Sequence, residues 1–285
     1  MLTTLTQILQ DAEAGGYAVV APDFTNLYTA RVLLEAAERR EAPLILSYAS
    51  SFKPMREIRS YRRFIAAVRE EIEASGIPAC LHLDHAESLE EIREAVEAGF
   101  NSVMIDASTS PWEDNLALTR EVVGYARPLG VSVEAELGQV TTGAGYFQSG
   151  SREETLTDPD QAAEFVAETG IDALAVAFGN AHGAYVGEPE LDFERLERIR
   201  SRVNLPIVLH GASGIPEGDL RRAVALGIRK INLYSELVYS QHKAALTVLR
   251  ETLMDPVGVA RAQAEGLEKV LGEFITWSGS GRREA

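Results

Sequence analysis

The hydrophobic positions of the chain fall into two alternating patterns. Short apolar runs, of which 17–22 and 44–49 are the first two, are typical of buried strands. The longer segments between them, beginning with 26–40, repeat their apolar residues at the three- and four-residue spacing of a helix. The expected strands are 17–22, 44–49, 79–84, 102–106, 131–137, 173–178, 206–210 and 230–234. The expected helices are 3–14, 26–40, 61–75, 89–98, 112–129, 160–169, 193–202, 217–226 and a final helical region, 235–277.

This order of elements predicts an α/β fold. Its strands are almost wholly apolar, as in a parallel sheet covered by helices on both faces. Eight strand and helix units in 285 residues match the size of a (β/α)8 TIM barrel, and a doubly wound open sheet is the alternative. No linker divides the chain, so we expect one domain from 1 to 285, with a long loop at 138–157 and a mobile tail at 279–285.

Composition narrows the class of partner. The formal net charge of −16 argues against nucleic acid or an anionic membrane, and an anionic substrate would need a local positive feature. Cys80 is the single cysteine and lies in an apolar strand, so it is expected to be a buried hydrophobe in a reducing compartment. The start of the chain lacks a signal-peptide pattern and no apolar run reaches the ~18 residues of a membrane span, which favours a cytoplasmic protein.

Three of the five histidines stand where expected strands end. His85, His182 and His210 would therefore meet at the C-terminal face of the barrel, where such barrels hold their active sites. Three neutral imidazoles leave an open position on a zinc ion, so we predict a catalytic zinc there. The alternative is that each histidine is simply hydrogen-bonded in the core. His82 points away from the site if its strand alternates, and His242 lies inside a helix, so both are expected to be structural.

Carboxylates accompany these histidines. Strict alternation would turn Asp84 away from His85, but at a fraying strand end both side chains can face one cavity. Glu136, together with Asp106, is a candidate to hold a second divalent or monovalent cation or to orient a ligand imidazole.

Glycines flank two of the candidate ligands, at 179–183 and 210–214. Glycine allows backbone amides to converge on an anion, and the loops after strands seven and eight are where barrels commonly bind phosphate. We therefore expect a phosphate site formed by Gly211, Ser213, Asn232 and Ser235.

Six motifs, in order, make the chain resemble the class II, zinc-dependent ketose-bisphosphate aldolases, which include the fructose- and tagatose-bisphosphate aldolases. The resemblance covers nearly the whole chain. The motifs are 81–85 (LHLDH), 99–106 (GFNSVMID), 133–138 (VEAELG), 181–183 (AHG), 208–214 (VLHGASG) and 230–232 (KIN).

The resemblance implies a site and a reaction. His85, His182 and His210 would bind zinc, and Asp84 would carry the proton in reversible retro-aldol cleavage of a ketose phosphate or bisphosphate to dihydroxyacetone phosphate and an aldehyde. It also implies a homodimer or homotetramer. The residues that it assigns to the dihydroxyacetone-phosphate site are Gly183, Gly211, Ala212, Ser213, Asn232, Leu233, Tyr234 and Ser235.

The chain departs from the family pattern at several substrate positions. Asp23 replaces the usual asparagine, Ala49 a serine and Val186 a phosphate-binding lysine, and Tyr234 precedes Ser235 where a smaller residue and threonine are usual. The loop 139–157 also lacks the usual acidic segment. Its candidates for a second proton carrier are Tyr146, Glu153 and Glu154. An aldolase or epimerase acting on an unphosphorylated or otherwise atypical sugar, and a non-catalytic barrel that binds metal and sugar phosphate, are the alternatives.

Overall fold

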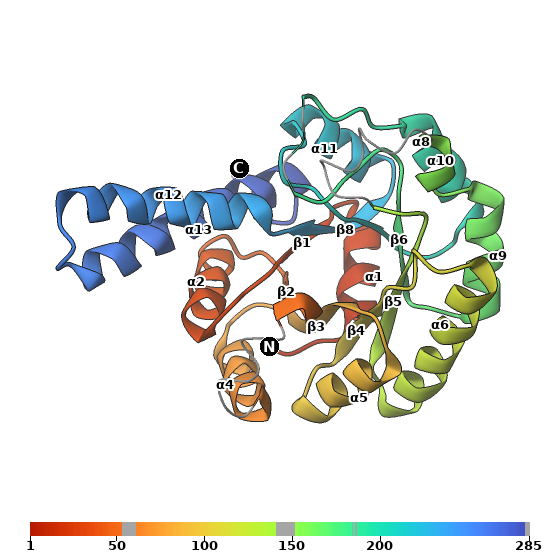
Figure 1. Ribbon diagram of the computed structural model, residues 1–285, viewed down its shortest axis with the longest axis horizontal. Coiled ribbons are helices and arrows are strands. Elements are labelled where there is room, and N and C mark those ends of the chain that lie inside the picture. Colours follow the sequence, from red (N-terminus) through yellow and green to blue (C-terminus); the bar gives the residue numbers. More distant parts are fainter. Residues whose placement is uncertain (53–60, 141–151, 184, 186, 283–285) are drawn as a thin grey trace.

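The protein is a parallel barrel. The computed structural model describes residues 1–52, 61–140, 152–183, 185 and 187–282 (Figure 1). Within these residues eight parallel strands are hydrogen-bonded in the order β1-β8-β7-β6-β5-β4-β3-β2. A bridge between Asp23 and Ser47 joins β1 to β2, so the (β/α)8 prediction is confirmed. The strands are β1 (Val19–Pro22), β2 (Leu44–Ala49), β3 (Ala79–Ala86), β4 (Ser102–Ile105), β5 (Ser132–Leu137), β6 (Ala173–Val176), β7 (Ile207–Leu209) and β8 (Ile228–Leu233).

Helices surround the barrel and one closes its base. Helix α1 turns Leu5, Ile8 and Leu9 against apolar side chains from the starts of the strands, such as Cys80, and so seals the N-terminal end. The helices of the described residues are α1 (Leu5–Gly15), α2 (Leu27–Glu38), α4 (Tyr61–Ala74), α5 (Leu89–Ala98), α6 (Trp112–Ala126), α8 (Arg152–Thr155), α9 (Pro159–Thr169), α10 (Phe193–Arg202), α11 (Glu217–Ala225), α12 (Ser235–Glu251) and α13 (Pro256–Ser278), with 3-10 turns η1 (Ser50–Phe52) and η2 (Arg127–Leu129).

Short polar signals set where these helices begin and end. The Ser88 hydroxyl accepts a hydrogen bond from the Glu91 backbone amide, and Gly99 ends the same helix, α5, in a left-handed conformation. Asp158 caps α9 in the same way, with a proline at the first helical position. Among the described helices, none is long and apolar enough to cross a membrane.

Three predicted boundaries were wrong. The final helical region is two helices, because the chain leaves α12 after Glu251 and Asp255 caps a new helix at Pro256. Strand β3 continues two residues past its predicted end, to Ala86, and the expected loop 138–157 contains α8. In the tail 279–285, Ser280 is buried and the Arg282 amide donates to the Arg40 carbonyl oxygen, whereas 283–285 lie outside the described residues.

Candidate metal centre and active site

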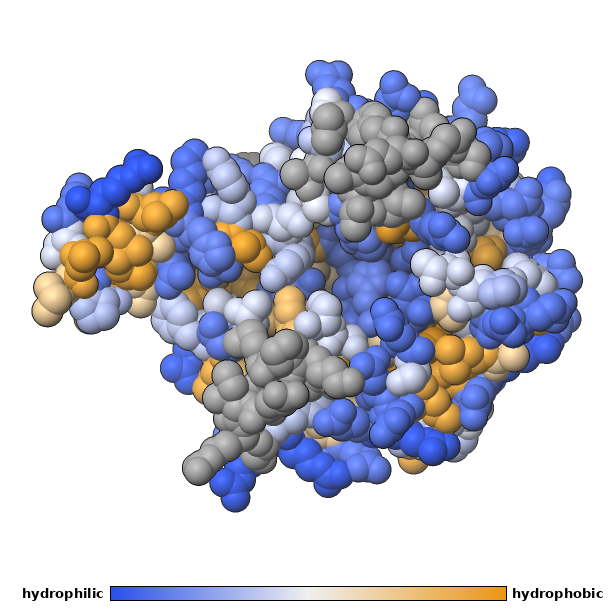
Figure 2. Space-filling view, viewed as in Figure 1, coloured by the Kyte–Doolittle hydropathy of each residue, from blue (hydrophilic) through white to orange (hydrophobic). Residues whose placement is uncertain are grey.

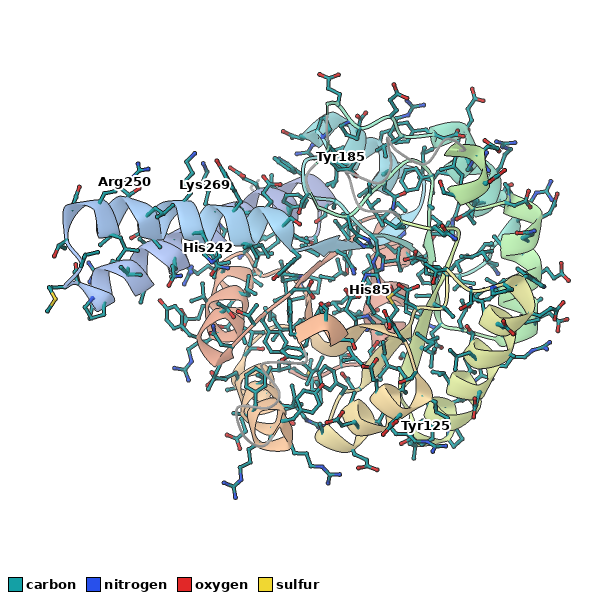
Figure 3. All side chains as sticks on the ribbon, in the orientation of Figure 1. His85, Tyr125, Tyr185, His242, Arg250 and Lys269 are labelled. Atoms are coloured by element: carbon teal, nitrogen blue, oxygen red, sulfur yellow. The ribbon has the colours of Figure 1, made fainter. Side chains whose placement is uncertain are left out.

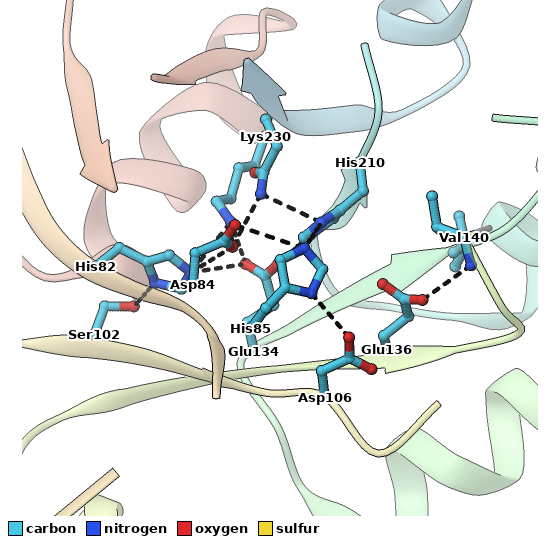
Figure 4. A network of polar contacts seen from close by, with 12 residues as sticks. His82, Asp84, His85, Ser102, Asp106, Glu134, Glu136, Val140, His210 and Lys230 are labelled. Atoms are coloured by element: carbon cyan, nitrogen blue, oxygen red, sulfur yellow. Dashed lines mark hydrogen bonds and ion pairs between the residues drawn. The ribbon is translucent and has the colours of Figure 1, made fainter. Parts of the chain in front are cut away.

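A charged layer lies inside the barrel beneath the site (Figure 4). The ammonium of Lys230, on β8, is fully buried and donates to Glu134 Oε2 at 2.8 Å and to His82 Nε2 at 3.3 Å. Because an ammonium only donates, His82 Nε2 accepts and its Nδ1–H donates to Ser102 Oγ at 2.7 Å. Burial alone would raise the pKa of Glu134, but Lys230 and the neighbouring histidines lower it to about 2. The layer therefore holds an ionised carboxylate against a buried cation.

The position of His82 corrects the expectation that it points away from the site. It shares the inward face of β3 with Asp84, two residues on, and its Nε2 lies 3.7 Å from Asp84 Oδ1. His82 is thus part of the support beneath Asp84. His242, by contrast, lies on α12. Figure 3 shows it away from the centre of the barrel, whereas His85 lies at that centre.

A bulge in β3 brings Asp84 and His85 to the same cavity. His85 has a φ of 50°, in the left-handed region that side chains other than glycine rarely adopt, and the register with β4 shifts between Leu83 and Ala86. The extra residue breaks the alternation that would have turned the two side chains apart. A β-bulge, rather than a fraying strand end, therefore turns Asp84 and His85 toward the same side of the strand.

The three predicted ligand histidines converge. The His85 ring centroid lies 4.9 Å from that of His182 and 4.7 Å from that of His210, and the latter two rings are 5.7 Å apart. One ring nitrogen from each falls within 4.8 Å of the others, and His85 Nε2 and His210 Nδ1 are 3.0 Å apart.

In each histidine the other ring nitrogen is held by an acceptor. His85 Nδ1–H donates to Asp106 Oδ2 at 2.8 Å and His210 Nε2–H donates to Glu134 Oε1 at 2.9 Å. His182 Nδ1–H donates to the Val140 carbonyl oxygen at 3.0 Å.

When the rings are neutral, these bonds leave the inward nitrogen of each ring without a proton, and His182 Nε2 is buried without a hydrogen-bond partner among the described residues. Metal-binding histidines are fixed in this way, so the residues fit a three-histidine zinc site.

The surroundings shift the pKa values of the three rings in opposite directions, upward for His85 and downward for His182 and His210. Burial alone would lower the pKa of His85, but Asp84, Asp106 and Glu136 raise it to about 10. Burial, with the charges of His85 and His210 nearby, lowers the pKa of His182 to about 3. One ring therefore attracts a proton strongly while its neighbour stays neutral, as expected where several imidazoles surround one place for a cation.

Asp106 and Glu136 lie on the same side of the centre. Asp106 Oδ1 accepts from the Ser108 amide at 3.1 Å and its hydroxyl at 2.7 Å, so both carboxylate oxygens are engaged. Glu136 Oε1 accepts from the Val140 amide at 3.0 Å, but Oε2 is buried with no partner among the described residues. Burial, then the charge of Asp106, raises the pKa of Glu136 to about 8. A ring nitrogen of His85 and oxygens of both carboxyl groups fall within 4.8 Å of one another.

The Asp84 carboxylate is fixed on one side and free on the other. Its Oδ1 accepts from Asn232 Nδ2 at 3.0 Å, while Oδ2 lies 3.6 Å from His85 Nε2. Burial alone would raise the pKa of Asp84, but His85, His82 and Lys230 hold it well below its usual value. An ionised oxygen that can accept a proton therefore lies beside the three nitrogens.

The predicted phosphate residues divide between two places. Asn232 lies in the barrel interior beside Asp84, 3.3 Å from His210 Nδ1, and Leu233 packs into the hydrophobic core. The loop after β7 and the start of α12 form the other place, where Ser213 Oγ accepts from the Glu236 amide at 3.1 Å and Ser235 is the first helical residue. A helix N-terminus of this kind favours an anion. Ala212 is buried there, and Tyr234 packs its ring against Phe52 at 5.3 Å.

Glycine is required in this loop. Gly211 has a φ of 66°, and a Cβ there would lie 2.2 Å from the carbonyl oxygen of Ala181, beside His182. Tyr185 joins the same two loops, since its hydroxyl donates to the Gly211 carbonyl oxygen and accepts from the Ala181 amide, both at 2.9 Å. Gly183 also has a positive φ, 86°, but none of the described residues lies within 4 Å of a Cβ built there. These contacts therefore position His210, at the end of β7, together with the turn that the sequence predicts to bind phosphate.

Of the positions that depart from the family pattern, Asp23 is the most informative. It is half-buried at the end of β1, and its Oδ1 is buried without a partner among the described residues. Burial and the charge of Asp84 raise its pKa well above the usual value. Ala49 is buried and pairs with Asp84 in the sheet.

Two of the loop candidates for a second proton carrier can be placed. Glu153 forms an ion pair with Arg195 on α10, and Glu154 follows it in α8. Val186 and Tyr146 lie outside the described residues.

Sequence reasoning missed Lys230 as a member of the site and gave Glu134, on strand five, no role in it. Both lie two residues before a predicted site residue on the same strand, Asn232 and Glu136, so alternation alone places them on the same inward face. A lysine inside an apolar strand was the available signal.

A separate open pocket at the other end of the barrel is a weaker candidate for the active site. This pocket of about 300 Å³ lies at the base of the barrel, bounded by Glu13, Asp172 and Arg200. It lacks histidine and lies at the strand N-termini, away from the face where such barrels carry chemistry.

The chain is similar to aldolases along its whole length. The family model described as fructose-bisphosphate aldolase class-II matches residues 3–283. A fructose-bisphosphate aldolase of Staphylococcus aureus (strain Mu50 / ATCC 700699) is 39% identical over 289 residues, which cover 96% of this chain and 98% of that protein. Among solved structures, the YdjI aldolase from Escherichia coli K12 superposes with a TM-score of 0.86 at 35% identity, covering 99% and 98% of the two chains. A putative fructose-1,6-biphosphate aldolase from Coccidioides immitis superposes with a TM-score of 0.85 at 28% identity, covering 97% and 96%.

Proposed function

The chain belongs to the class II fructose-bisphosphate aldolase family and is an aldolase, and from this premise we propose a zinc-dependent enzyme that reversibly cleaves a ketose phosphate. The products would be dihydroxyacetone phosphate and an aldehyde. The convergence of His85, His182 and His210 beside the ionised Asp84 is the observation that carries the proposal. A zinc ion held by these rings supplies Lewis-acid chemistry at the substrate carbonyl.

The proton is moved by the chain's own residues. Asp84 Oδ2 accepts the proton of the C4 hydroxyl group, the C3–C4 bond breaks, and the electron pair stays on C3 of the three-carbon half. Asn232 keeps Oδ1 occupied through the 3.0 Å bond, so the second oxygen faces the reacting hydroxyl. In the synthetic direction Asp84 returns the proton to the new C4 oxygen.

The phosphate of the three-carbon half is proposed to bind at the start of α12. The Gly211–Ser213 turn is joined to the first turn of α12, because Ser213 Oγ accepts a hydrogen bond from the Glu236 amide and Ser235 is the first helical residue. The helix dipole supplies the positive potential that a chain of net charge −16 otherwise lacks.

A second cation is proposed beside the first, between Asp106 and Glu136. The buried Oε2 of Glu136 supports it, because no hydrogen-bond partner for this atom exists among the described residues. Replacing Glu136 with glutamine should lower the number of metal ions bound per chain while leaving the three-histidine ion in place. An unchanged metal count in that variant argues for an orienting role alone.

The second candidate substrate is a ketose 1-phosphate that carries no phosphate at its far end. Asp23 supports it, because an unpartnered carboxyl oxygen can bond to a sugar hydroxyl group and its charge, when ionised, repels a phosphate. We compare the ratio of kcat/KM for a ketose 1,6-bisphosphate to kcat/KM for the matched 1-phosphate. In the Asp23→Asn variant this ratio should be about tenfold or more higher than in the parent. An unchanged ratio would remove Asp23 from substrate selection.

The main test combines metal analysis with a cleavage assay. The protein as purified should bind zinc, cleave at least one ketose 1-phosphate or 1,6-bisphosphate, lose this activity in chelator and regain it on adding zinc. His182→Ala should bind zinc far more weakly, whereas His242→Ala, its matched control on α12, should not. Metal-independent cleavage, or no cleavage of any ketose phosphate by the zinc-loaded protein, would contradict the proposal.

A further inference from the structure

The loops that carry His182 and His210 lie beyond the end of the pairing between their strands. Strands β6 and β7 pair in register at two positions, and the second joins Ala175 to Val208. This pair lies two residues before His210 and seven before His182. The spacing of the two histidines therefore depends on contacts between the loops rather than on the sheet.

Asn180 makes one of these contacts. Its side chain is buried, and Nδ2 donates to the His210 carbonyl oxygen at 3.0 Å and to the Val176 carbonyl oxygen at 3.2 Å. Its Oδ1 accepts from the Phe178 amide at 2.8 Å. All three bonds go to main-chain groups, so the amide side chain takes the place of the missing strand pairing. Asn180 thus fixes the main chain of His210 against the end of β6.

Tyr185 makes a second contact, one residue further along each loop. Its hydroxyl group donates to the Gly211 carbonyl oxygen and accepts from the Ala181 amide, both at 2.9 Å. Ala181 directly precedes His182, and Gly211 directly follows the other histidine. The loops are also tightly packed here, because a Cβ on Gly211 would lie 2.2 Å from the Ala181 carbonyl oxygen. A shift of one loop must therefore be followed by the other.

The second contact also reaches the turn that is proposed to bind phosphate. Gly211 begins this turn, and Ser213 Oγ accepts from the Glu236 amide at the start of α12. In Figure 2 the surface over the barrel centre is hydrophilic, at the place where Figure 3 shows His85, so an anion can approach this side of the barrel from solvent. Asn180 and Tyr185 therefore connect the ligand histidines to the anion-binding turn.

We propose that Asn180 and Tyr185 couple the two sites, so that a metal ion at the histidines and an anion at the 211–213 turn each bind more tightly when the other is present. The inference rests on the proposed function and states how its two sites act on one another. An anion that fixes Gly211 also fixes the Ala181 amide, through the hydroxyl group of Tyr185, and with it the next residue, His182. By linkage, a metal ion held by the histidines fixes the turn to the same extent.

Zinc binding with and without an anion tests the coupling separately from catalysis. Inorganic sulfate is the probe, because it is a tetrahedral dianion like phosphate but does not precipitate zinc, and chloride keeps the ionic strength constant. In the parent, saturating sulfate should lower the zinc dissociation constant at least ~fivefold. Tyr185→Phe removes only the bridging oxygen, so it should raise the zinc dissociation constant and reduce the effect of sulfate to less than about half of its parent value.

The ratio of the two zinc dissociation constants separates coupling from a purely structural role. If Tyr185 only stabilised the loops, its loss would raise the zinc dissociation constant by the same factor with and without sulfate. Tyr28→Phe is the matched control, because the Tyr28 hydroxyl on α2 donates to the Ala260 carbonyl oxygen on α13 at 2.8 Å. This control loses the same kind of hydrogen bond, and its two dissociation constants should equal those of the parent.

A second variant covers the case in which Tyr185→Phe fails to fold. Asn180→Ala removes the bond to the His210 carbonyl oxygen and should also reduce the effect of sulfate on zinc binding. The measurement on the parent needs no variant at all. A parent zinc dissociation constant that sulfate leaves unchanged overturns the proposal, and so does a sulfate effect of parent size in the folded variants.

Failure of the coupling is distinct from failure of the proposed function. A parent that cleaves a ketose phosphate with zinc but shows no effect of sulfate on zinc binding contradicts the coupling alone. A parent in which sulfate tightens zinc binding through Tyr185, but which cleaves no ketose phosphate, contradicts the proposed function and supports the coupling.

Discussion

Replacing Lys230 with methionine should destabilise the fold more than any surface change. The ammonium is fully buried and 2.8 Å from Glu134 Oε2, and it lies 4.0 Å from Asp84 Oδ1. Methionine has a similar length but no charge, so the variant leaves two buried carboxylates without their cation. At an effective dielectric constant near 20, the attraction between two unit charges at the 2.8 Å distance of Lys230 and Glu134 is about 6 kcal/mol, before the cost of burying both charges is subtracted.

The measured loss should be smaller than that Coulomb energy. Removing one partner of a buried pair costs roughly 3–5 kcal/mol of unfolding free energy, because the remaining charge is uncompensated. Urea denaturation in excess chelator measures it, so that zinc bound to the native state adds nothing. Lys269→Met, at an exposed position on α13, is the control and should change the unfolding free energy by less than about 0.5 kcal/mol.

The loss should also depend on pH. The pKa of Glu134 is lowered from 4.5 to about 2 in the parent, so its stabilisation is complete above pH 4.5 and is lost as the pH falls through 2. Without Lys230 only the histidines offset the burial of Glu134, so its pKa should rise and its ionisation should stabilise the native state less at neutral pH than in the parent. The gap between parent and variant should therefore narrow as the pH falls from 7 toward 3.

A double variant tests whether loss of the Lys230–Glu134 ion pair causes the drop in unfolding free energy. Adding Glu134→Gln to Lys230→Met should recover a large part of the lost stability at pH 7, because the uncompensated charge is gone. A Lys230→Met loss below about 1 kcal/mol, or no recovery in the double variant, would refute the reasoning.

Three further predictions concern single residues. Asp84→Asn should lower kcat by about 10²-fold or more while zinc content stays at the parent level, because the amide cannot accept the proton; turnover within tenfold of the parent would exclude Asp84 as the base. Gly211→Ala should lower the unfolding free energy by about 2 kcal/mol or more in urea titrations, since its Cβ would meet a backbone oxygen, whereas Gly183→Ala should cost about half as much because its surroundings are open. Burial raises the pKa of Cys80 to about 12, so it should stay protonated and unreactive toward a thiol reagent at pH 8 until the chain is unfolded; rapid labelling of the native protein would contradict its burial.

The fold followed from the sequence because its signals are local and repeated. Eight apolar runs separated by helical segments leave few topologies, and the motifs around His85, His182 and His210 lie at strand ends that any such barrel brings together. The end of α12 was missed because the apolar spacing continues toward Val257 while Asp255 and Pro256 start a new helix.

The inner layer was harder to predict for a different reason. The orientation of His82 and Lys230 depends on which way each strand faces, and the bulge at His85 changes that direction within two residues of Asp84. A pattern of period two cannot show where the period breaks. The partners of the ligand histidines, such as the Val140 carbonyl oxygen, come from backbone positions that carry no sequence signal.

Positive charge on two sides of the site offsets the negative charge of its carboxylates. A site that would hold a cation and accept a proton needs negative charge, supplied here by Asp84 and Asp106, yet too much of it would keep a sugar phosphate away. Lys230 offsets this charge from below, where it cannot touch the substrate because it is fully buried beneath Asp84. The N-terminus of α12, where we propose that the phosphate binds, would offset this charge from another side. A loss of Lys230 should therefore weaken phosphate binding as well as stability, even though no phosphate contacts it.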